Sequence, residues 1–379
     1  MATGIIAEFN PFHNGHKYLL EKAKDENGVV AVMSGSFVQR GDIAITDKWT
    51  RAGMALDNGA DLVIELPVIY SLNTAQKFAL GAVSTLAATG IINRITFGSE
   101  SGNTDAIKKA AFLTANEPET VSLKIKELIK TGINYPSARA KAYKDFLDSE
   151  ILSTPNDILG VEYIRAAIDS KFNCEFCAVE RKGVSHDSHE INGSVASASQ
   201  IRNMIRKNTE VTEFIPGSYD FPIYSLSRLD TAITAKLRTC GSEYLKTIND
   251  VSEGLENRFI SAAAECDTFE EICSLVKSKR YTLSRIRRIA LSSYIGLTKE
   301  LASLTPSYIR VLGMNSKGKE LLKQMKKTAS IPVVIKSSEL KNDKIFKLNN
   351  SAEDVFSLCC NDKNYRKGGR DFTVSPVIV

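Results

Sequence analysis

The chain has 379 residues, of which 43% are hydrophobic and 25% are charged, and this composition is ordinary for a globular protein with a sizeable core. No apolar run approaches the length of a membrane span and the N-terminus lacks the order of a signal peptide, so we expect a cytoplasmic protein. Seven cysteines argue against a disulfide framework, and a net charge of +5 permits a nucleic-acid partner without requiring one.

A strand, a turn and a helix are predicted at the N-terminal end of the chain. The apolar run Ile5-Ile6-Ala7 predicts a buried strand, Asn10-Pro11 ends it, and residues 14–21 have helical spacing. The unpaired N–H groups and the dipole at a helix start both favour an anion. A phosphate is therefore the expected ligand of this segment.

Two histidines, His13 and His16, flank Gly15 at the start of the predicted helix. Their imidazoles can donate to phosphate oxygens and stabilise a departing pyrophosphate, and the glycine lets a nucleotide approach the backbone. This H-x-G-H pattern resembles the signature of the HIGH-type nucleotidyltransferases, a Rossmann-like group that activates substrates by attack on the α-phosphorus of ATP.

Strands and helices alternate through the following segment. Strands are predicted at 28–35, 62–67 and 92–97, and helices at 46–58 and 74–88. This alternation predicts an α/β fold with a Rossmann-like parallel sheet and right-handed crossovers.

A polar loop follows the second predicted strand. Its side chains would lie at the carboxyl end of that strand, where open α/β sheets bind ligands, and a solvated loop is the alternative. The candidate substrate-binding residues here are Gln39, Arg40 and Lys48, with Asp42 beside them.

The next part of the chain is predicted to complete this domain. Residues 105–149 are Lys- and Glu-rich with helical character and indicate a helical insertion, and a further helix opens near Asn156. A strand over 176–181 ends at Arg181, a candidate phosphate contact, with a surface arginine as the alternative. A helix opening at 194–202 has hydroxyls in its first turn and Arg202 one turn on, which can hold β- and γ-phosphates or can be a plain capped helix.

Four residues in this region have the chemistry of zinc ligands: Cys174, Cys177, His186 and His189. Both their spacings are short for a tetrahedral finger, which usually separates its pairs by about 12 residues or more. Because Cys177 falls within an apolar strand, we expect it to pack as a small hydrophobic side chain and expect no metal site.

The chain beyond residue 210 is predicted to be mainly helical, with helices at 227–239, 241–264 and 268–278. Residues 277–291 then combine basic side chains with an aromatic one. On a helix, Arg285 and Arg288 share one face, which can face solvent or a polyanion, and Tyr281 could stack on a base. The candidate tRNA-binding residues are Lys279, Arg280, Tyr281, Arg285, Arg287 and Arg288; a solvated helix face is the alternative.

Residues 308–335 read as a strand, an amphipathic helix and a second strand. We interpret them as a small α/β unit closing a C-terminal domain. The expected division is therefore a nucleotide-binding domain at 1–210, with its insertion near 105–150, and a second domain at 211–379.

Six motifs occur in order along the chain, at 8–16, 35–41, 47–52, 59–67, 97–100 and 156–160. Together they resemble the bacterial tRNA(Met) cytidine acetate ligases, and the basic residues at 279–281 and 285–288 extend the likeness. The resemblance implies that ATP and acetate form acetyl-adenylate and pyrophosphate. The acetyl group would then pass to the N4 amine of the wobble cytidine of elongator tRNA(Met), and no DNA partner is expected.

The resemblance also implies which residues bind ATP. The segment that would wrap the nucleotide consists of Ile6, Ala7, Glu8, Phe9, Asn10, Pro11, Phe12, Asn14, Gly15, Lys17, Tyr18 and Leu19, with His13 and His16 on the phosphates. Gly98 or Gly102, Asn156, Arg181, Ser199 and Arg202 would complete the pocket. Mg²⁺ is expected with ATP, because the β- and γ-oxygens need neutralising, although no carboxylate stands out as its ligand.

Two other functions fit parts of the pattern. An adenylyltransferase that joins AMP to a small phosphorylated metabolite would use the same H-x-G-H corner and would leave the basic helix incidental. A non-catalytic RNA-binding protein would use the basic helix and keep the nucleotide pocket for folding.

Overall fold

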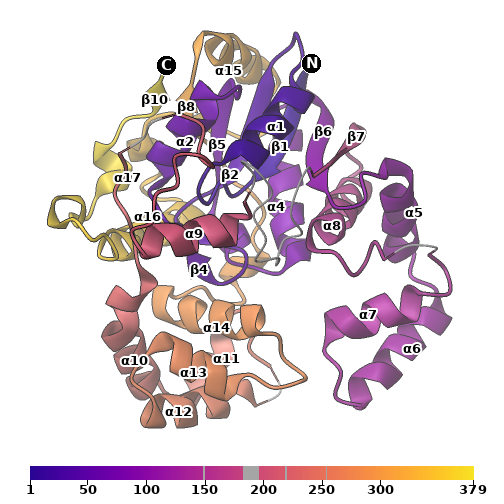
Figure 1. The fold of residues 1–379 in the computed structure, drawn as a ribbon, viewed down its shortest axis with the longest axis vertical. Coiled ribbons are helices and arrows are strands. Elements are labelled where there is room, and N and C mark those ends of the chain that lie inside the picture. The colour runs from indigo at the N-terminus through magenta and orange to yellow at the C-terminus, as the bar shows by residue number, and fades with distance from the viewer. Residues whose placement is uncertain (148–149, 182–195, 218–219, 253) are drawn as a thin grey trace.

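The computed structural model describes residues 1–147, 150–181, 196–217, 220–252 and 254–379 (Figure 1). A mixed, mostly parallel sheet lies at its centre, with the strand order β10-β8-β5-β2-β1-β6-β7 and with β9 paired to β8. The strands are β1 (Ala2–Ala7), β2 (Val29–Ser34), β5 (Leu62–Leu66), β6 (Ile92–Ser99), β7 (Glu175–Glu180), β8 (Ile309–Met314), β9 (Val333–Val334) and β10 (Val377–Ile378). The α/β fold predicted from the sequence is confirmed.

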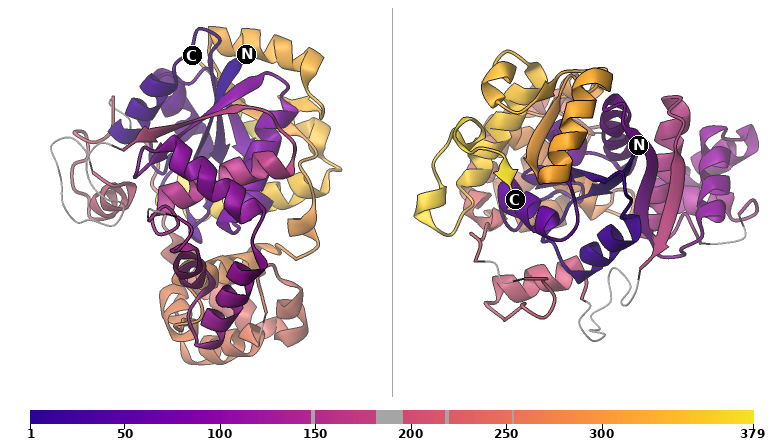
Figure 2. Two further views of the ribbon diagram at one scale, coloured as in Figure 1. Left: turned by 90° about the vertical axis from the view of Figure 1, so that its right-hand side faces the viewer. Right: turned by 90° about the horizontal axis from the view of Figure 1, so that it is seen from above.

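Helices cover both faces of this sheet, as Figure 2 shows from above. Alternate residues of each strand enter different cores: Ile6, Val32 and Ile64 belong to one, and Ile5 and Met33 to the other. On the first face pack α4 (Ala75–Ala88), α8 (Pro155–Asp169), α15 (Ser316–Thr328) and α16 (Lys344–Ser357). On the second pack α1 (Asn14–Ala23), α2 (Lys48–Asp57) and α9 (Ala198–Arg206).

Local capping explains where several helices begin. The side chain of Asp47 accepts the N–H of Thr50 at the start of α2, and Thr74 accepts the N–H of Lys77 at the start of α4. Two short segments differ from expectation. The polar loop at 36–42 contains a hairpin of β3 (Phe37–Val38) and β4 (Asp42–Ile43), and the helix expected at 241–264 is two helices.

The C-terminal strands do not form a separate unit. Strand β8 pairs antiparallel with β5, with Glu65 opposite Arg310, so the strands of the last third of the chain extend the N-terminal sheet. The prediction of a small α/β unit closing a C-terminal domain is therefore wrong. The physical reason is that every residue of β8 is buried, which requires cover on both faces.

Two further groups of helices lie beside and below the sheet in Figure 1. The insertion holds α5 (Thr104–Ala115), α6 (Glu119–Lys130) and α7 (Tyr135–Tyr143). The second group holds α10 (Asp230–Thr239), α11 (Gly241–Thr247), α12 (Leu255–Glu265), α13 (Phe269–Val276) and α14 (Leu283–Ile295). The short helices α3 (Val68–Ser71) and α17 (Arg370–Thr373) flank α16. Within the described ranges, no helix has the length and apolar character needed to cross a membrane.

Candidate active site

The candidate active site lies where β1 ends and α1 begins. Strands β5, β2, β1, β6 and β7 lie in the Rossmann order, so the chain reverses its direction of travel across the sheet between β1 and β6. Ligands of open α/β sheets bind at the carboxyl ends of strands at this switch point. Phe9 follows β1 with a φ of 47°, in the left-handed region that few non-glycine residues adopt, and its buried ring fixes the turn toward α1.

His13 and His16 together cap α1. Nδ1 of His13 accepts the N–H of Gly15 at 3.0 Å, and Nδ1 of His16 accepts the N–H of His13 at 3.3 Å. Because both Nδ1 atoms accept, a neutral ring carries its proton on Nε2. Both histidines line the cavity described below, so each can offer an Nε2–H donor to a phosphate oxygen.

Packing holds these rings in place. The two imidazoles stack with centroids 3.8 Å apart, and His16 meets the ring of Phe9 edge-on at 5.0 Å. A Cβ on Gly15 would lie 2.8 Å from Cε1 of His13, so a glycine is needed there. Burial, followed by the neighbouring His13 and Arg181, lowers the pKa of His16 well below its usual 6.5. His16 is therefore neutral at pH 7.

Buried Arg51 fixes the strand ends beside this corner. Its Nη1 donates to the carbonyl oxygens of Glu8 at 2.7 Å and Ser34 at 2.9 Å, and its Nη2 donates to that of Gly35. One side chain thus satisfies carbonyl groups at the carboxyl ends of two neighbouring strands. Burial lowers the pKa of Arg51 to about 10, which leaves it charged at neutral pH. Arg51 was not predicted as a functional residue, because its partners at the strand ends lie far from it along the chain.

Glu8 and three arginines set the charge of the corner. Glu8 accepts the N–H of Gln39 at 2.8 Å, and burial raises its pKa against the lowering effects of that hydrogen bond and of Arg202. Arg202 donates from Nη1 to the carbonyl oxygen of Asn10 at 2.7 Å. Arg40 and Arg181 line the same cavity. The excess of guanidinium groups over carboxylates suits a triphosphate.

The loop after β6 is tied to the start of α8 by two carboxylates. Glu100 accepts hydrogen bonds from the backbone N–H of Asn156 at 3.0 Å and from Nδ2 of Asn156 at 2.6 Å. Asp157 accepts a hydrogen bond from the N–H of Ser101 at 3.2 Å. Asp157 is buried, so its role here is to hold the loop. Gly98 lines the cavity, whereas Gly102 has a φ of +62° and turns the chain beside Glu180.

A cavity of about 910 Å³ opens from this corner. Its volume lies at the upper end of the range of ligand pockets, roughly 300–1,000 Å³. Many of the residues predicted to bind ATP or substrate line it: Ile6, Ala7, Glu8, Phe9, Asn10, His13, Asn14, Gly15, His16, Tyr18, Leu19, Gln39, Arg40, Gly98, Asn156, Arg181 and Arg202. Several predicted residues do not line it: Pro11, Phe12, Lys17, Gly102, Ser199 and Lys48.

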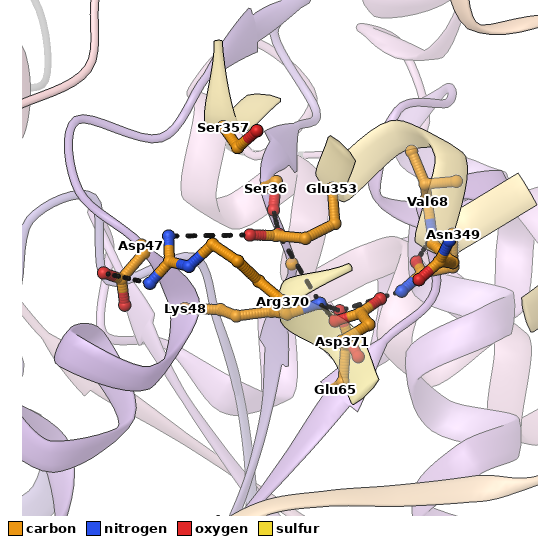
Figure 3. Close-up of polar contacts among 12 residues, drawn as sticks. Ser36, Asp47, Lys48, Glu65, Val68, Asn349, Glu353, Ser357, Arg370 and Asp371 are labelled. Carbon is orange, nitrogen blue, oxygen red and sulfur yellow. Dashed lines mark hydrogen bonds and ion pairs between the residues drawn. The ribbon is translucent and has the colours of Figure 1, made fainter. Parts of the chain in front are cut away.

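Lys48 lies instead in a buried ionic cluster (Figure 3). Its ammonium group is fully buried and pairs with Asp371 at 2.6 Å and Glu65 at 2.7 Å. Burial opposes this charge, but the two carboxylates outweigh it and raise the pKa of Lys48. Arg310 pairs with the same two carboxylates at 2.8 and 2.7 Å. The prediction that Lys48 belongs to a substrate loop is wrong, because its carboxylate partners lie on β5 and α17 and hold it in the protein interior.

The basic segment before and within α14 is only partly exposed. Arg285 and Arg288 pair with Asp250, each at 3.1 Å, and Arg288 is buried. Tyr281 is buried beneath the guanidinium of Arg285, 5.1 Å from its ring centre. Of the two surroundings predicted for the face of Arg285 and Arg288, solvent is excluded for Arg288. The prediction that Tyr281 stacks on a base is wrong, because its ring is buried.

Three of these basic residues nevertheless reach the cavity. Arg280, Arg285 and Arg288 line it, whereas Lys279 is exposed outside it. Arg287 donates from Nε to the carbonyl oxygen of Gly41 at 2.8 Å. The start of α14 thus both borders the cavity and holds the tip of the β3–β4 hairpin.

No zinc centre is found within the described ranges, where no group of three or more potential ligands gathers. Cys177 is exposed on β7, contrary to the expectation that it packs in the core, because β7 is the edge strand of the sheet. His186 and His189 lie outside the described residues.

The fold and the H-x-G-H corner define a HIGH-type nucleotidyltransferase, and a family model described as HIGH Nucleotidyl Transferase matches residues 1–371. A tRNA(Met) cytidine acetate ligase from Thermoanaerobacter sp. is 40% identical over 401 residues, covering 99% of this chain and 98% of the relative. One from Clostridium perfringens is 36% identical over 405 residues, covering 99% of each. The crystal structure of Thermotoga maritima TmcAL bound with alpha-thio ATP is 33% identical, with a TM-score of 0.91 and full coverage of both chains. The chain belongs to the tRNA(Met) cytidine acetate ligase family.

Proposed function

We propose that this protein is a ligase that uses ATP to join acetate to N4 of the wobble cytidine of elongator tRNA(Met). The observation that carries the proposal is one continuous cavity, which opens from the H-x-G-H corner and extends to Arg280 before α14 and to Arg285 in its first turn. The name of the relatives, tRNA(Met) cytidine acetate ligase, supports the same substrates, and the ATP analogue bound to T. maritima TmcAL supports ATP. A tRNA substrate is consistent with a cytoplasmic location.

In the first step, a carboxylate oxygen of acetate attacks the α-phosphorus of ATP. A new phosphorus–oxygen bond forms, the bond to the leaving pyrophosphate breaks, and acetyl-adenylate results. His13 and His16 offer Nε2–H donors to the charge that develops on the phosphates, and Arg181 and Arg202 add positive charge. Of the two candidate glycines, Gly98 is the one proposed to contact the nucleotide, because it lines the cavity.

In the second step, the N4 amine of cytidine attacks the acetyl carbon. The carbon–nitrogen bond forms, the carbon–oxygen bond to AMP breaks, and N4 loses one proton. Acetate itself is a poor acyl donor, whereas AMP is a good leaving group. The basic residues beside α14 are proposed to hold the RNA backbone while its base enters the cavity.

Mg²⁺ is proposed to accompany ATP. In the part of the chain that the structure describes, no group of three or more His, Cys, Asp or Glu residues could hold a metal ion. The triphosphate oxygens and water would therefore supply most of its ligands, as is usual for Mg²⁺. When bound, the ion would neutralise charge on the β- and γ-phosphates.

The test is to incubate the protein with ATP, isotopically labelled acetate and an elongator tRNA(Met) transcript. The proposal predicts AMP, pyrophosphate and labelled acetyl on the wobble cytidine. In a parallel incubation with candidate phosphorylated metabolites in place of acetate, an adenylyltransferase would instead release pyrophosphate and join AMP to the metabolite. Tight tRNA binding without any turnover would indicate a non-catalytic RNA-binding protein.

A further inference from the structure

A second wall of the cavity is built by the helical insertion and α8, away from the H-x-G-H corner. Tyr135 and Arg139 lie one turn apart on α7, and Glu162 and Arg165 lie one turn apart on α8. All four line the cavity. Glu162 lies six residues beyond Asn156, which places it about 9 Å further along α8 than the proposed nucleotide contact.

The three charged side chains of this wall form a triad with unused hydrogen-bonding atoms. Nη1 of Arg139 donates to Oε1 of Glu162 at 2.5 Å, and Nη1 of Arg165 lies 3.8 Å from Oε2. Nη2 of Arg139, Oε2 of Glu162 and Nε of Arg165 are buried and have no hydrogen-bond partner among the residues that the structure describes. The Glu162 side chain is only 3% exposed, so its unused acceptor is costly unless a ligand satisfies it.

Tyr135 supplies an open aromatic face next to the triad. It is 52% exposed, whereas Phe9, Phe78, Phe97 and Tyr163, which also line the cavity, are buried. Exposed aromatic side chains are the usual stacking platforms for unpaired RNA bases. Nothing in the proposed adenylation step uses this ring or the triad.

We propose that Tyr135, Arg139 and Glu162 form the pocket for the target nucleobase, and that this pocket selects cytosine over uracil; this inference rests on the proposed function. Cytosine presents a donor at N4 and acceptors at N3 and O2. Oε2 of Glu162 accepts from N4, Nη2 of Arg139 donates to the ring acceptors, and the base stacks on Tyr135. Uracil would place its O4 acceptor against Oε2 of Glu162. These two oxygens would repel each other, and neither would have a hydrogen-bond donor.

The test measures binding of two elongator tRNA(Met) transcripts, one with cytidine and one with uridine at the wobble position, to the full-length protein. Wild type is expected to prefer cytidine by about tenfold or more. Glu162→Gln keeps the shape but can present an amide donor, so the preference should fall to near unity or reverse. An unchanged preference in a folded Glu162→Gln protein would overturn the proposal.

Tyr135 gives an independent test, because its replacement leaves the Arg139–Glu162 pair intact. Tyr135→Ala should weaken binding of the cytidine transcript about tenfold, and Tyr135→Phe should restore it. Phe112→Ala is the control, since Phe112 is a 63% exposed aromatic of the same insertion that does not line the cavity. Equal effects of Tyr135→Ala and Phe112→Ala, or a weakened ATP affinity in Tyr135→Ala, would contradict the assignment.

These binding measurements separate this inference from the proposed function. If wild type fails to transfer acetate yet discriminates between the transcripts through Glu162, the base pocket stands and the acetate chemistry is wrong. If wild type acetylates tRNA and the Glu162→Gln and Tyr135→Ala variants behave like it, the base pocket is wrong and the ligase stands.

Discussion

Nη1 of Arg288 lies 3.3 Å from the carbonyl oxygen of Gln39 and donates to it. The N–H of the same Gln39 donates to Glu8, which directly follows β1 at the nucleotide corner. The helical region is thereby connected through one hairpin residue to the proposed site of adenylate formation. Arg288 thus supports the corner, in addition to any contact that it makes with RNA.

Replacing Arg288 with Ala should impair both half-reactions. The change removes the support of Gln39 and leaves Asp250 with only one of its two arginine partners. We expect the free energy of unfolding to fall by about 1–3 kcal/mol and the KM for ATP to rise. Thermal unfolding and ATP-dependent pyrophosphate release measure the two effects. Loss of tRNA binding alone, with normal ATP kinetics, would show that Arg288 contacts only RNA.

His16→Ala should abolish most adenylate formation. Loss of one donor to charge that develops on a phosphate typically lowers kcat by about 10²–10³-fold. The affinity for tRNA should stay nearly unchanged, because His16 lies at the nucleotide corner. Pyrophosphate release in the presence of acetate and a tRNA-binding titration measure the two quantities. Equal losses in both would contradict this division of roles.

The lowered pKa of His16 predicts a pH dependence of stability. At pH values between the native pKa of His16 and its unfolded value of about 6.5, the imidazole is protonated in the unfolded chain but not in the native chain. The His16 contribution to the free energy of unfolding should therefore fall as the pH is lowered through 6.5. Denaturant unfolding of wild type and His16→Asn at pH 5.5 and 7.5 measures it.

The difference in the free energy of unfolding between wild type and His16→Asn isolates the effect of His16. This comparison is needed because the titration of Glu353 changes stability with pH in the opposite direction. Burial raises the pKa of Glu353 to about 7, so its contribution to stability is lost as the pH rises from 4.5 toward 7. Comparing wild type with His16→Asn cancels the contribution of Glu353. A pH-independent difference would mean that His16 titrates normally in the folded protein.

Lys48→Met should destabilise the protein without changing ATP binding. Removing one partner of a buried ion pair leaves Glu65 and Asp371 incompletely compensated and typically costs about 3–5 kcal/mol. Thermal unfolding and ATP titration test this. A role in a substrate loop would give the reverse pattern, with normal stability and a changed KM.

The exposed basic residues before α14 should contribute electrostatically to tRNA binding. Lys277, Lys279 and Arg280 are exposed, and the triple Ala variant should reduce the salt slope of tRNA affinity by up to about 1 for each phosphate that is no longer neutralised. Replacing the exposed Lys323, Lys326 and Lys327 of α15 with Ala provides a matched control, because α15 lies above the sheet in Figure 1 and α14 below it. Equal slopes in both variants would place the RNA elsewhere.

Local sequence predicted the elements of the first half because their signals are short-range. The apolar runs of β1, β2 and β5 are readable within a few residues, and the structure has strands at those positions. The H-x-G-H motif also predicted the position of the corner. The capping box of His13 and His16 was not predicted, because it depends on which ring nitrogen meets which backbone N–H.

What could not be read from the sequence depends on pairings between distant residues. Lys48 resembles a solvent-exposed lysine until Asp371 and Glu65 are placed beside it, and β8 resembles part of a separate unit until it pairs with β5. Likewise, the arginines of α14 resemble a free basic face, whereas Arg287 holds Gly41 of the hairpin.

In the proposed reaction, the H-x-G-H corner presents the α-phosphorus of ATP to a carboxylate. The most direct test is mass analysis of the AMP formed from ATP and acetate labelled with ¹⁸O in both oxygens, in the presence of elongator tRNA(Met). Attack of acetate on the α-phosphorus predicts that the AMP carries one ¹⁸O atom. Label found in phosphate or pyrophosphate, with none in AMP, would contradict the account.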